Sequence, residues 1–173
     1  MNMRPSWNTY FMTIAFVVAQ RSLDPETKHG CVVVADDHTI LSVGYNSPPR
    51  GCDDAKIPLT RPEKYDYFAH AEENAISNAA KHGIPLDGST FYITGIPCTK
   101  CFRSIVNVGA HTIVVGDVIS NCVKDIPSEP YLRMGLHSTV DEIRHSCYIR
   151  DGHLDVQNLL ENTKQYINNT CRG

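Results

Sequence analysis

Apolar residues near the N-terminus recur at the spacing of an amphipathic helix. This series predicts a helix from about Ser6 to Arg21, ended by Asp24-Pro25. Two apolar runs follow, over residues 31–35 and 39–45, and the short turn between them predicts a β-hairpin. The chain therefore begins with a helix followed by two paired strands.

The hydrophobic pattern then stops for a long stretch. From Asn46 to Phe68 the sequence has four prolines and no periodicity, which predicts a loop. Loops of this length in a compact domain are uncommon and are usually functional or disordered. Its position directly before the strongest motif of the chain favours function. The aromatic residues Tyr65, Tyr67 and Phe68 at its end either wall a base-binding pocket or serve packing.

Alternating helices and strands follow this loop. In chain order the sequence predicts a helix over 71–82, a strand over 89–94, a helix over 98–108 and a strand over 112–116. A glycine follows each of these two helices, at 83 and 109, as is common at helix C-termini. Residues 121–149 have no clear pattern, and 154–167 predicts a terminal helix. The alternation is typical of one α/β domain.

Composition and charge narrow the class of protein. A chain of 173 residues suits one domain, and its net charge of -3 without a basic stripe argues against a nucleic-acid partner. No run approaches the roughly 18 apolar residues of a membrane span, and the N-terminus lacks a signal-peptide pattern. We therefore expect a cytoplasmic protein without a membrane partner. Seven cysteines are more typical of metal binding or catalysis here than of disulfides.

Two short motifs carry candidate chemistry. His70-Ala71-Glu72 and Pro97-Cys98-Thr99-Lys100-Cys101 each open a predicted helix. One imidazole and two thiolates would supply three ligands for Zn²⁺, which leaves the fourth position free for water, as in catalytic zinc sites. A closed structural zinc site is the alternative, but it needs a further cysteine pair. The remaining cysteines, Cys31, Cys52, Cys122, Cys147 and Cys171, lack such spacing.

The order His-x-Glu followed by Pro-Cys-x-x-Cys resembles the signature of zinc nucleobase deaminases, in which the glutamate is not a ligand but transfers protons. By this resemblance His70, Cys98 and Cys101 bind the metal and Glu72 is catalytic. Zinc can lower the pKa of bound water from 15.7 to about 7, which would activate it for attack on the ring carbon that bears the amine.

Further blocks resemble the cytidine/deoxycytidylate deaminase superfamily, and within it the deoxycytidylate deaminases. They are Tyr10-Phe11-Met12, Ala19-Gln20-Arg21-Ser22, Asp24-Pro25, Gly44-Tyr45-Asn46, Gly51-Cys52-Asp53-Asp54 and His70 to Ile76. The resemblance covers about Trp7 to Asp117. It implies a single zinc-dependent deaminase domain over 1–173, with a core of about 6–118 and a divergent extension of about 119–173. The implied fold is a three-layer α/β cytidine-deaminase-like fold, with a mixed, largely parallel five-stranded sheet flanked by helices.

The resemblance also implies an activity and its regulation. We expect hydrolysis of dCMP to dUMP and ammonia by a homo-oligomer, often a hexamer, with one catalytic zinc per chain. The expected effectors are dCTP as activator and dTTP as inhibitor, with Mg²⁺ accompanying a bound triphosphate. The effector candidates are Arg21, Asn46, Pro48, Arg50 and Gly51, and the substrate-binding candidates are Asn46, Ala71 and Asn74.

Three alternatives remain. The enzyme could act on a related free nucleoside, or on a base within RNA or DNA, although the acidic balance argues against the latter. A non-catalytic zinc or nucleotide-sensing module would have no use for Glu72.

Lys28 and His29, just before a predicted strand, either contact a phosphate or are solvated turn residues.

Overall fold

A computed structural model describes residues 4–118, without the side chains of Asp117 and Val118. Its helices and strands are α1 (Trp7–Ala19), β1 (Gly30–Val34), β2 (Ile40–Tyr45), α2 (Ala71–His82), β3 (Thr90–Gly95), α3 (Thr99–Asn107) and β4 (Thr112–Val118). Every helix and strand expected in this part of the chain is confirmed, with small shifts at the ends. The long loop contains two 3-10 turns that were not expected, η1 (Asp54–Lys56) and η2 (Glu63–Asp66). The helix predicted over 154–167 lies outside the described residues.

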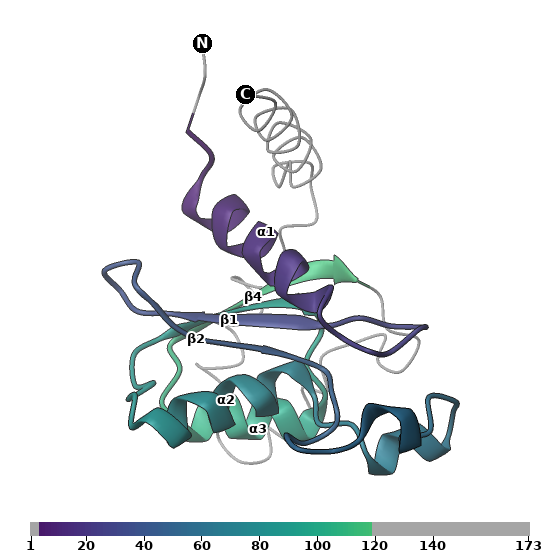
Figure 1. The fold of residues 1–173 in the computed structure, drawn as a ribbon. Coiled ribbons are helices and arrows are strands. Elements are labelled where there is room, and N and C mark those ends of the chain that lie inside the picture. The colour runs from purple at the N-terminus through teal and green to yellow at the C-terminus, as the bar shows by residue number, and fades with distance from the viewer. Residues whose placement is uncertain (1–3, 119–173) are drawn as a thin grey trace, which may run out of the picture.

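The strands form one mixed sheet in the order β2-β1-β3-β4 (Figure 1). Strand β1 pairs antiparallel with β2 and β3, whereas β3 and β4 are parallel. The mixed sheet is confirmed, but residues 4–118 supply four strands rather than five, and one of these three pairings is parallel. The physical reason lies in the connections. A tight turn joins β1 to β2 and makes them antiparallel, while α3 provides the crossover that a parallel pair needs.

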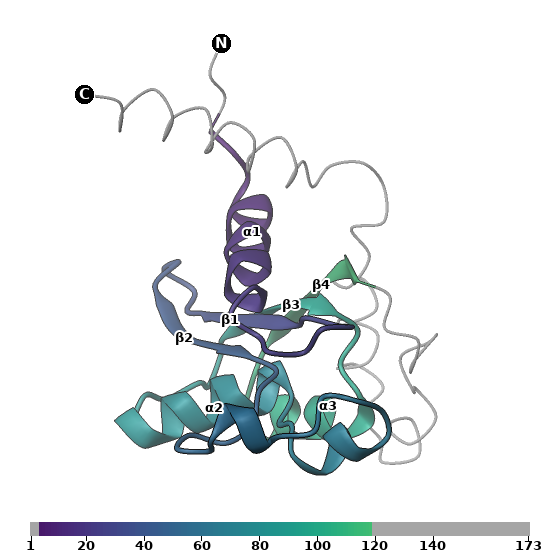
Figure 2. The same ribbon diagram turned by 45° about the vertical axis from the view of Figure 1, so that its right-hand side comes forward.

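Helices cover both faces of the sheet, with α1 on one side and α2 and α3 on the other (Figures 1 and 2). Successive residues of β1 point to opposite faces, as in any strand. Val32 and Val34 pack in the cluster that contains Phe11 of α1. Cys31 and Val33 pack in the cluster that contains residues of α2 and α3. The three layers therefore follow directly from the alternation of apolar side chains.

Helix α1 is buried on one side only. Ser6 caps its N-terminus by accepting a hydrogen bond from the Thr9 backbone N–H at 3.2 Å. Its outer side exposes Trp7, Tyr10 and Val17. Across residues 4–118, no helix has the length and apolar character that crossing a bilayer would demand.

One glycine sets the distance between β2 and α2. A Cβ placed on Gly44 would lie 2.2 Å from the carbonyl oxygen of Ala71 and 2.4 Å from the backbone nitrogen of Ala75. Only glycine allows so close an approach of two backbones. The N-terminal half of α2 is thus pressed onto the sheet, which fixes the height of the residues that open this helix.

The long loop leaves and rejoins the fold at one place. Ser47 and Ala69 form an antiparallel bridge, with N–H to O distances of 3.2 Å and 2.9 Å. Between these residues the loop extends past one end of α2 and α3, where η1 and η2 lie (Figure 1). The bridge places the end of the loop immediately before His70.

Candidate active site

The three predicted metal ligands lie at two helix N-termini. His70 is the N-cap of α2, and Cys98 is the N-cap of α3, both with extended backbone. The Glu73 carboxylate accepts a hydrogen bond from the His70 N–H at 2.8 Å, which closes the first turn of α2. Cys101 follows in the first turn of α3 and is fully buried. Two helix starts therefore bring together residues about thirty positions apart.

Their geometry fits zinc. The Nδ1 atom of His70 lies 3.5 Å from the Cys98 Sγ and 3.4 Å from the Cys101 Sγ. All three ligand atoms lie within 4.8 Å of one another. Tetrahedral zinc, with its usual bond lengths to nitrogen and sulfur, would hold these atom types about 3.6 Å apart. His70, Cys98 and Cys101 can therefore hold one zinc ion with little rearrangement.

Hydrogen bonds among His70, Cys98 and Cys101 shift the pKa values of all three side chains. Hydrogen bonds from Cys101 and His70 lower the pKa of Cys98 to about 3. The hydrogen bond to Cys98 raises the pKa of His70 to about 9, and the pKa of Cys101 is raised by its hydrogen bond to Cys98. The Cys98 thiolate thus accepts hydrogen bonds from the Cys101 thiol and from the His70 ring. Metal binding requires the ligands to give up these protons.

Glu72 lies beside the ligands on the first turn of α2. It lines the same cleft as His70 and Cys98, yet only 5% of its surface is exposed. Burial raises the pKa of its carboxyl group above the usual range. A carboxyl group held in this way is suited to accept a proton and to return it.

The cleft extends from the ligands to a polar end. Its lining comprises His70, Ala71, Glu72 and Cys98 at the ligand end, Tyr65, Phe68, Gly95 and Ile96 along the walls, and Asp24, Thr27, His29, Asn46, Arg61 and Lys64 at the polar end. Of the aromatic residues that were candidates for a base pocket, Tyr65 and Phe68 line the cleft, whereas Tyr67 does not. Half of Tyr67 is exposed.

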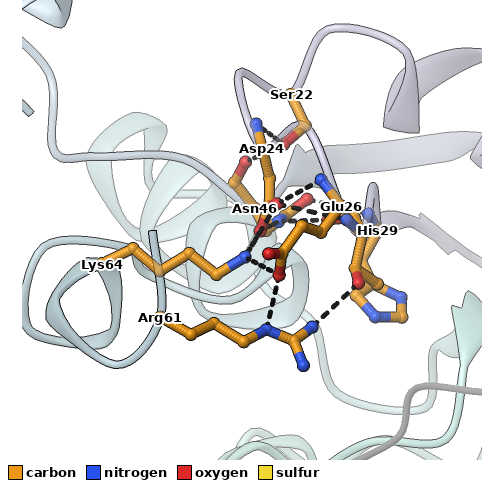
Figure 3. Close-up of polar contacts among 8 residues, drawn as sticks. Ser22, Asp24, Glu26, His29, Asn46, Arg61 and Lys64 are labelled. Carbon is orange, nitrogen blue, oxygen red and sulfur yellow. Dashed lines mark hydrogen bonds and ion pairs between the residues drawn. The ribbon is translucent and has the colours of Figure 1, made fainter. Parts of the chain in front are cut away.

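A buried ion pair organises the polar end (Figure 3). The Lys64 side chain is 3% exposed, and its Nζ lies 2.9 Å from both carboxylate oxygens of Asp24 and 3.1 Å from Oε2 of Glu26. Burial alone would raise the pKa of Asp24, but hydrogen bonds from Lys64 and from two backbone N–H groups outweigh it, so this pKa is lowered. Sequence reasoning missed Lys64. The sequence did offer a signal, because Lys64 stands directly before the aromatic-rich segment 65–68 that leads to His70.

Asn46 supports this end of the cleft through all of its amide atoms. Its Oδ1 accepts from the His29 N–H at 2.8 Å, while its Nδ2 donates to the Thr27 carbonyl at 3.0 Å and to Asp24 at 3.4 Å. The residue therefore shapes the segment that precedes β1 (Figure 3). Its contact with a substrate or an effector stays a prediction, as does that of Ala71, which is fully buried at the ligand end.

A second cleft gathers most of the effector candidates. Arg21, Pro48, Arg50 and Gly51 line it. Asn74 lies here as well rather than in the first cleft, and its Nδ2 donates to the Tyr45 carbonyl at 2.8 Å. The predicted contact of Asn74 with the substrate stays a prediction. Arg50 donates a hydrogen bond to Asn78 at the same cleft.

Comparison with known proteins agrees with this site. The family model of the cytidine and deoxycytidylate deaminase zinc-binding region matches residues 5–117. The chain belongs to this family, as its motifs indicate. Human deoxycytidylate deaminase is 37% identical over 114 residues, which cover 62% of this chain and 63% of the relative. ComE operon protein 2 of Bacillus subtilis is 34% identical over 131 residues, which cover 74% of this chain and 65% of the relative.

Solved structures give the same picture. The dCMP deaminase of the cyanophage S-TIM5 in apo form has a TM-score of 0.57 at 30% identity, and the match covers 65% of this chain and 84% of that one. The same enzyme in complex with dCMP and dUMP has a TM-score of 0.55 at 28% identity, with 66% and 83% covered. The chain spans less than two thirds of the length of the human enzyme. The similarity is thus concentrated in the deaminase core.

Proposed function

We propose that the protein hydrolyses dCMP to dUMP and ammonia. The observation that carries the proposal is a buried carboxylate, Glu72, beside three side chains whose spacing fits zinc. The cyanophage relative was crystallised with dCMP and dUMP, which supports a nucleotide substrate. The aromatic and apolar wall residues Tyr65, Phe68 and Ile96 suit a flat pyrimidine ring.

In this proposal the side chains have distinct roles. His70, Cys98 and Cys101 would hold the zinc, which when bound supplies a Lewis acid that activates water. The Glu72 carboxylate accepts a proton from that water and transfers it to the ring nitrogen next to the reacting carbon. Glu72 then delivers the second proton to the departing amine. The water oxygen bonds to the ring carbon, and the bond between this carbon and the exocyclic amine nitrogen breaks. The products are dUMP and ammonia.

Glu72→Gln tests this role, with Glu73→Gln as the matched control. The first change removes the proton carrier, so kcat should fall by about 10²–10⁴-fold while zinc content stays the same. The second keeps an oxygen that can cap the His70 N–H, so kcat should change little. The assay follows conversion of dCMP and release of ammonia. Similar kcat values in the two variants would contradict the mechanism.

We propose further that the second cleft binds the effectors dCTP, accompanied by Mg²⁺, and dTTP. Two arginines on its lining, Arg21 and Arg50, offer charges for a triphosphate. A panel of dCMP, deoxycytidine, cytidine and cytosine, assayed with and without each effector, should show activation by dCTP and inhibition by dTTP for dCMP alone. Arg50→Met should weaken both effects, and an unchanged response would remove this cleft from consideration.

The family also suggests a homo-oligomer, often a hexamer, within the cytoplasm. Exposed apolar residues on α1 and on the edge strand β2, among them Trp7, Val17 and Val43, support self-association. Light scattering of the purified chain gives the mass directly, and a monomeric mass at working concentration would contradict the assembly.

A further inference from the structure

None of the roles proposed for the deamination step falls to the polar end of the first cleft. Two of its residues are committed to each other, because the three N–H groups of Lys64 face three carboxylate oxygens of Asp24 and Glu26. The Lys64 ammonium therefore has no donor left for a ligand. Its charge offsets that of the buried Asp24, which holds the segment before β1 against η2.

Arg61, by contrast, keeps unused donors. Its Nε lies 2.6 Å from Glu26 Oε2, and its Nη2 donates to Thr27 Oγ1 at 3.2 Å. A guanidinium group has five N–H donors, so three remain. The side chain is 34% exposed and lines the cleft. Since Thr27 Oγ1 already accepts from Arg61, its own O–H is free to donate.

His29 offers a third donor in the tautomer that carries its hydrogen on Nε2. Thr94 Oγ1 accepts a hydrogen bond from the Gly30 N–H at 3.0 Å and has one hydrogen of its own to donate. Nδ1 of His29 lies 3.4 Å from this hydroxyl and accepts its hydrogen in that tautomer. In the neutral ring the hydrogen then resides on Nε2. Burial lowers the pKa of His29, which favours this neutral form.

The Nε2 atom of His29 is accessible from the cleft. No buried side-chain nitrogen or oxygen in the described part of the chain lacks a hydrogen-bond partner. The ring lines the cleft, and its Nδ1 contacts the Thr94 hydroxyl, so Nε2 is the ring nitrogen that reaches solvent there. Figure 3 shows the His29 ring and the Arg61 guanidinium on the same lower side of the Asp24–Lys64 pair. The donors of the two side chains can thus serve one ligand group.

We propose that Thr27, His29 and Arg61 read the phosphate of the substrate and so select a nucleoside monophosphate over the free nucleoside. This inference rests on the proposed function, because the ring of the substrate must lie at the ligand end. Three donors, one of them cationic, match an oxyanion with several acceptor atoms.

The test compares kcat/KM for dCMP with kcat/KM for deoxycytidine. His29→Val and Arg61→Met should each lower this ratio by about ten-fold to one hundred-fold, the range expected for the loss of a hydrogen bond to a charged group. His29→Gln retains a side-chain donor and should keep more of the preference than His29→Val. Lys28→Met is the matched control, because the Lys28 ammonium bonds the Gln20 carbonyl outside the cleft. Its ratio should equal that of the wild type.

Binding of dUMP and of deoxyuridine by titration calorimetry gives a second measurement that does not depend on turnover. The two donor-free variants should bind dUMP more weakly and deoxyuridine nearly as the wild type does. Unchanged ratios and unchanged dUMP affinity in both variants would overturn the inference. Failure of the proposed function looks different, because the wild type itself would then prefer deoxycytidine or deaminate neither compound.

Discussion

At the scale of single residues, the buried Lys64 is the most demanding feature of the structure. A buried ammonium group is stable only when partners offset the loss of hydration. Asp24 and Glu26 do so in the folded chain, where the Lys64 pKa is raised: burial lowers it, but the hydrogen bonds to both carboxylates more than compensate. The pair contributes order to the cleft rather than a large surplus of stability.

Removing one partner should therefore be costly. Lys64→Met leaves the Asp24 carboxylate buried without its cation, and we expect a loss of about 3–5 kcal/mol in the free energy of unfolding. The control is Lys56→Met, since Lys56 pairs with Asp53 at the surface with 80% of its side chain exposed. That change should cost at most about 1 kcal/mol. Urea unfolding monitored by circular dichroism measures both.

The same variant should show a distinctive pH dependence. In the wild type the folded pKa of Asp24 lies below its usual 3.8, so the stability from this group is present above that pH and is lost as the pH falls through the folded pKa. Without Lys64, burial raises the Asp24 pKa, and protonation then relieves the buried charge. The penalty of Lys64→Met should thus shrink between neutral pH and about pH 4. A constant penalty would show that the ion pair is not its cause.

At the scale of secondary-structure elements, the contact between β2 and α2 positions the chemistry. Gly44 lies against the first turns of α2, so a larger residue must push this helix off the sheet. The helix begins with His70 as its cap, and Glu72 follows in its first turn. The packing of this strand and the position of the proposed catalytic residue are therefore linked through one backbone contact.

Gly44→Ala should reduce both stability and turnover. We expect a cost of about 1–3 kcal/mol from overpacking and a clear fall in kcat for dCMP, because His70 and Glu72 move with the helix. Gly83→Ala is the control at the other end of α2. Its Cβ would meet nothing within 4 Å, but its φ of 66° is unfavourable for alanine, with a cost of about 1 kcal/mol. Equal kcat values for the two variants would refute the link.

Local patterns predicted the elements well because each depends on neighbours in sequence. Helix α2 was bounded correctly from its apolar face and from Gly83, and the His-x-Glu and Cys-x-x-Cys motifs identified residues that the structure indeed brings together. Turn η2 escaped prediction because its anchor, the Lys64–Asp24 pair, spans 40 positions. Asn74 lines the second cleft, and its contact with the substrate stays a prediction.

At the scale of the whole molecule, the metal site joins two separate parts of the chain. His70 opens α2 and the two cysteines open α3, with β3 between them in sequence. Zinc would therefore cross-link the layer of helices below the sheet. Because binding free energy adds to folding free energy, the ion should stabilise the domain as well as serve catalysis.

Cys98→Ser tests whether this cysteine binds zinc and stabilises the domain through it. We expect zinc content, measured by elemental analysis, to fall from about one ion per chain to near zero, with Tm lower by about 5 °C or more. Cys52→Ser is the control, because Cys52 is an exposed free cysteine away from the ligand group. It should leave both quantities unchanged. Full zinc content in Cys98→Ser would contradict the assigned ligand set.

The bridge between Ser47 and Ala69 has a consequence for how such proteins diversify. Because the intervening segment departs from and returns to neighbouring points, its size is independent of where His70 stands. Closing a loop twice as long costs only about 0.6 kcal/mol more. Insertions within residues 51–60, which are exposed or half-buried, can thus change the outer part of the loop while the Lys64–Asp24 pair and the position of His70 stay as they are.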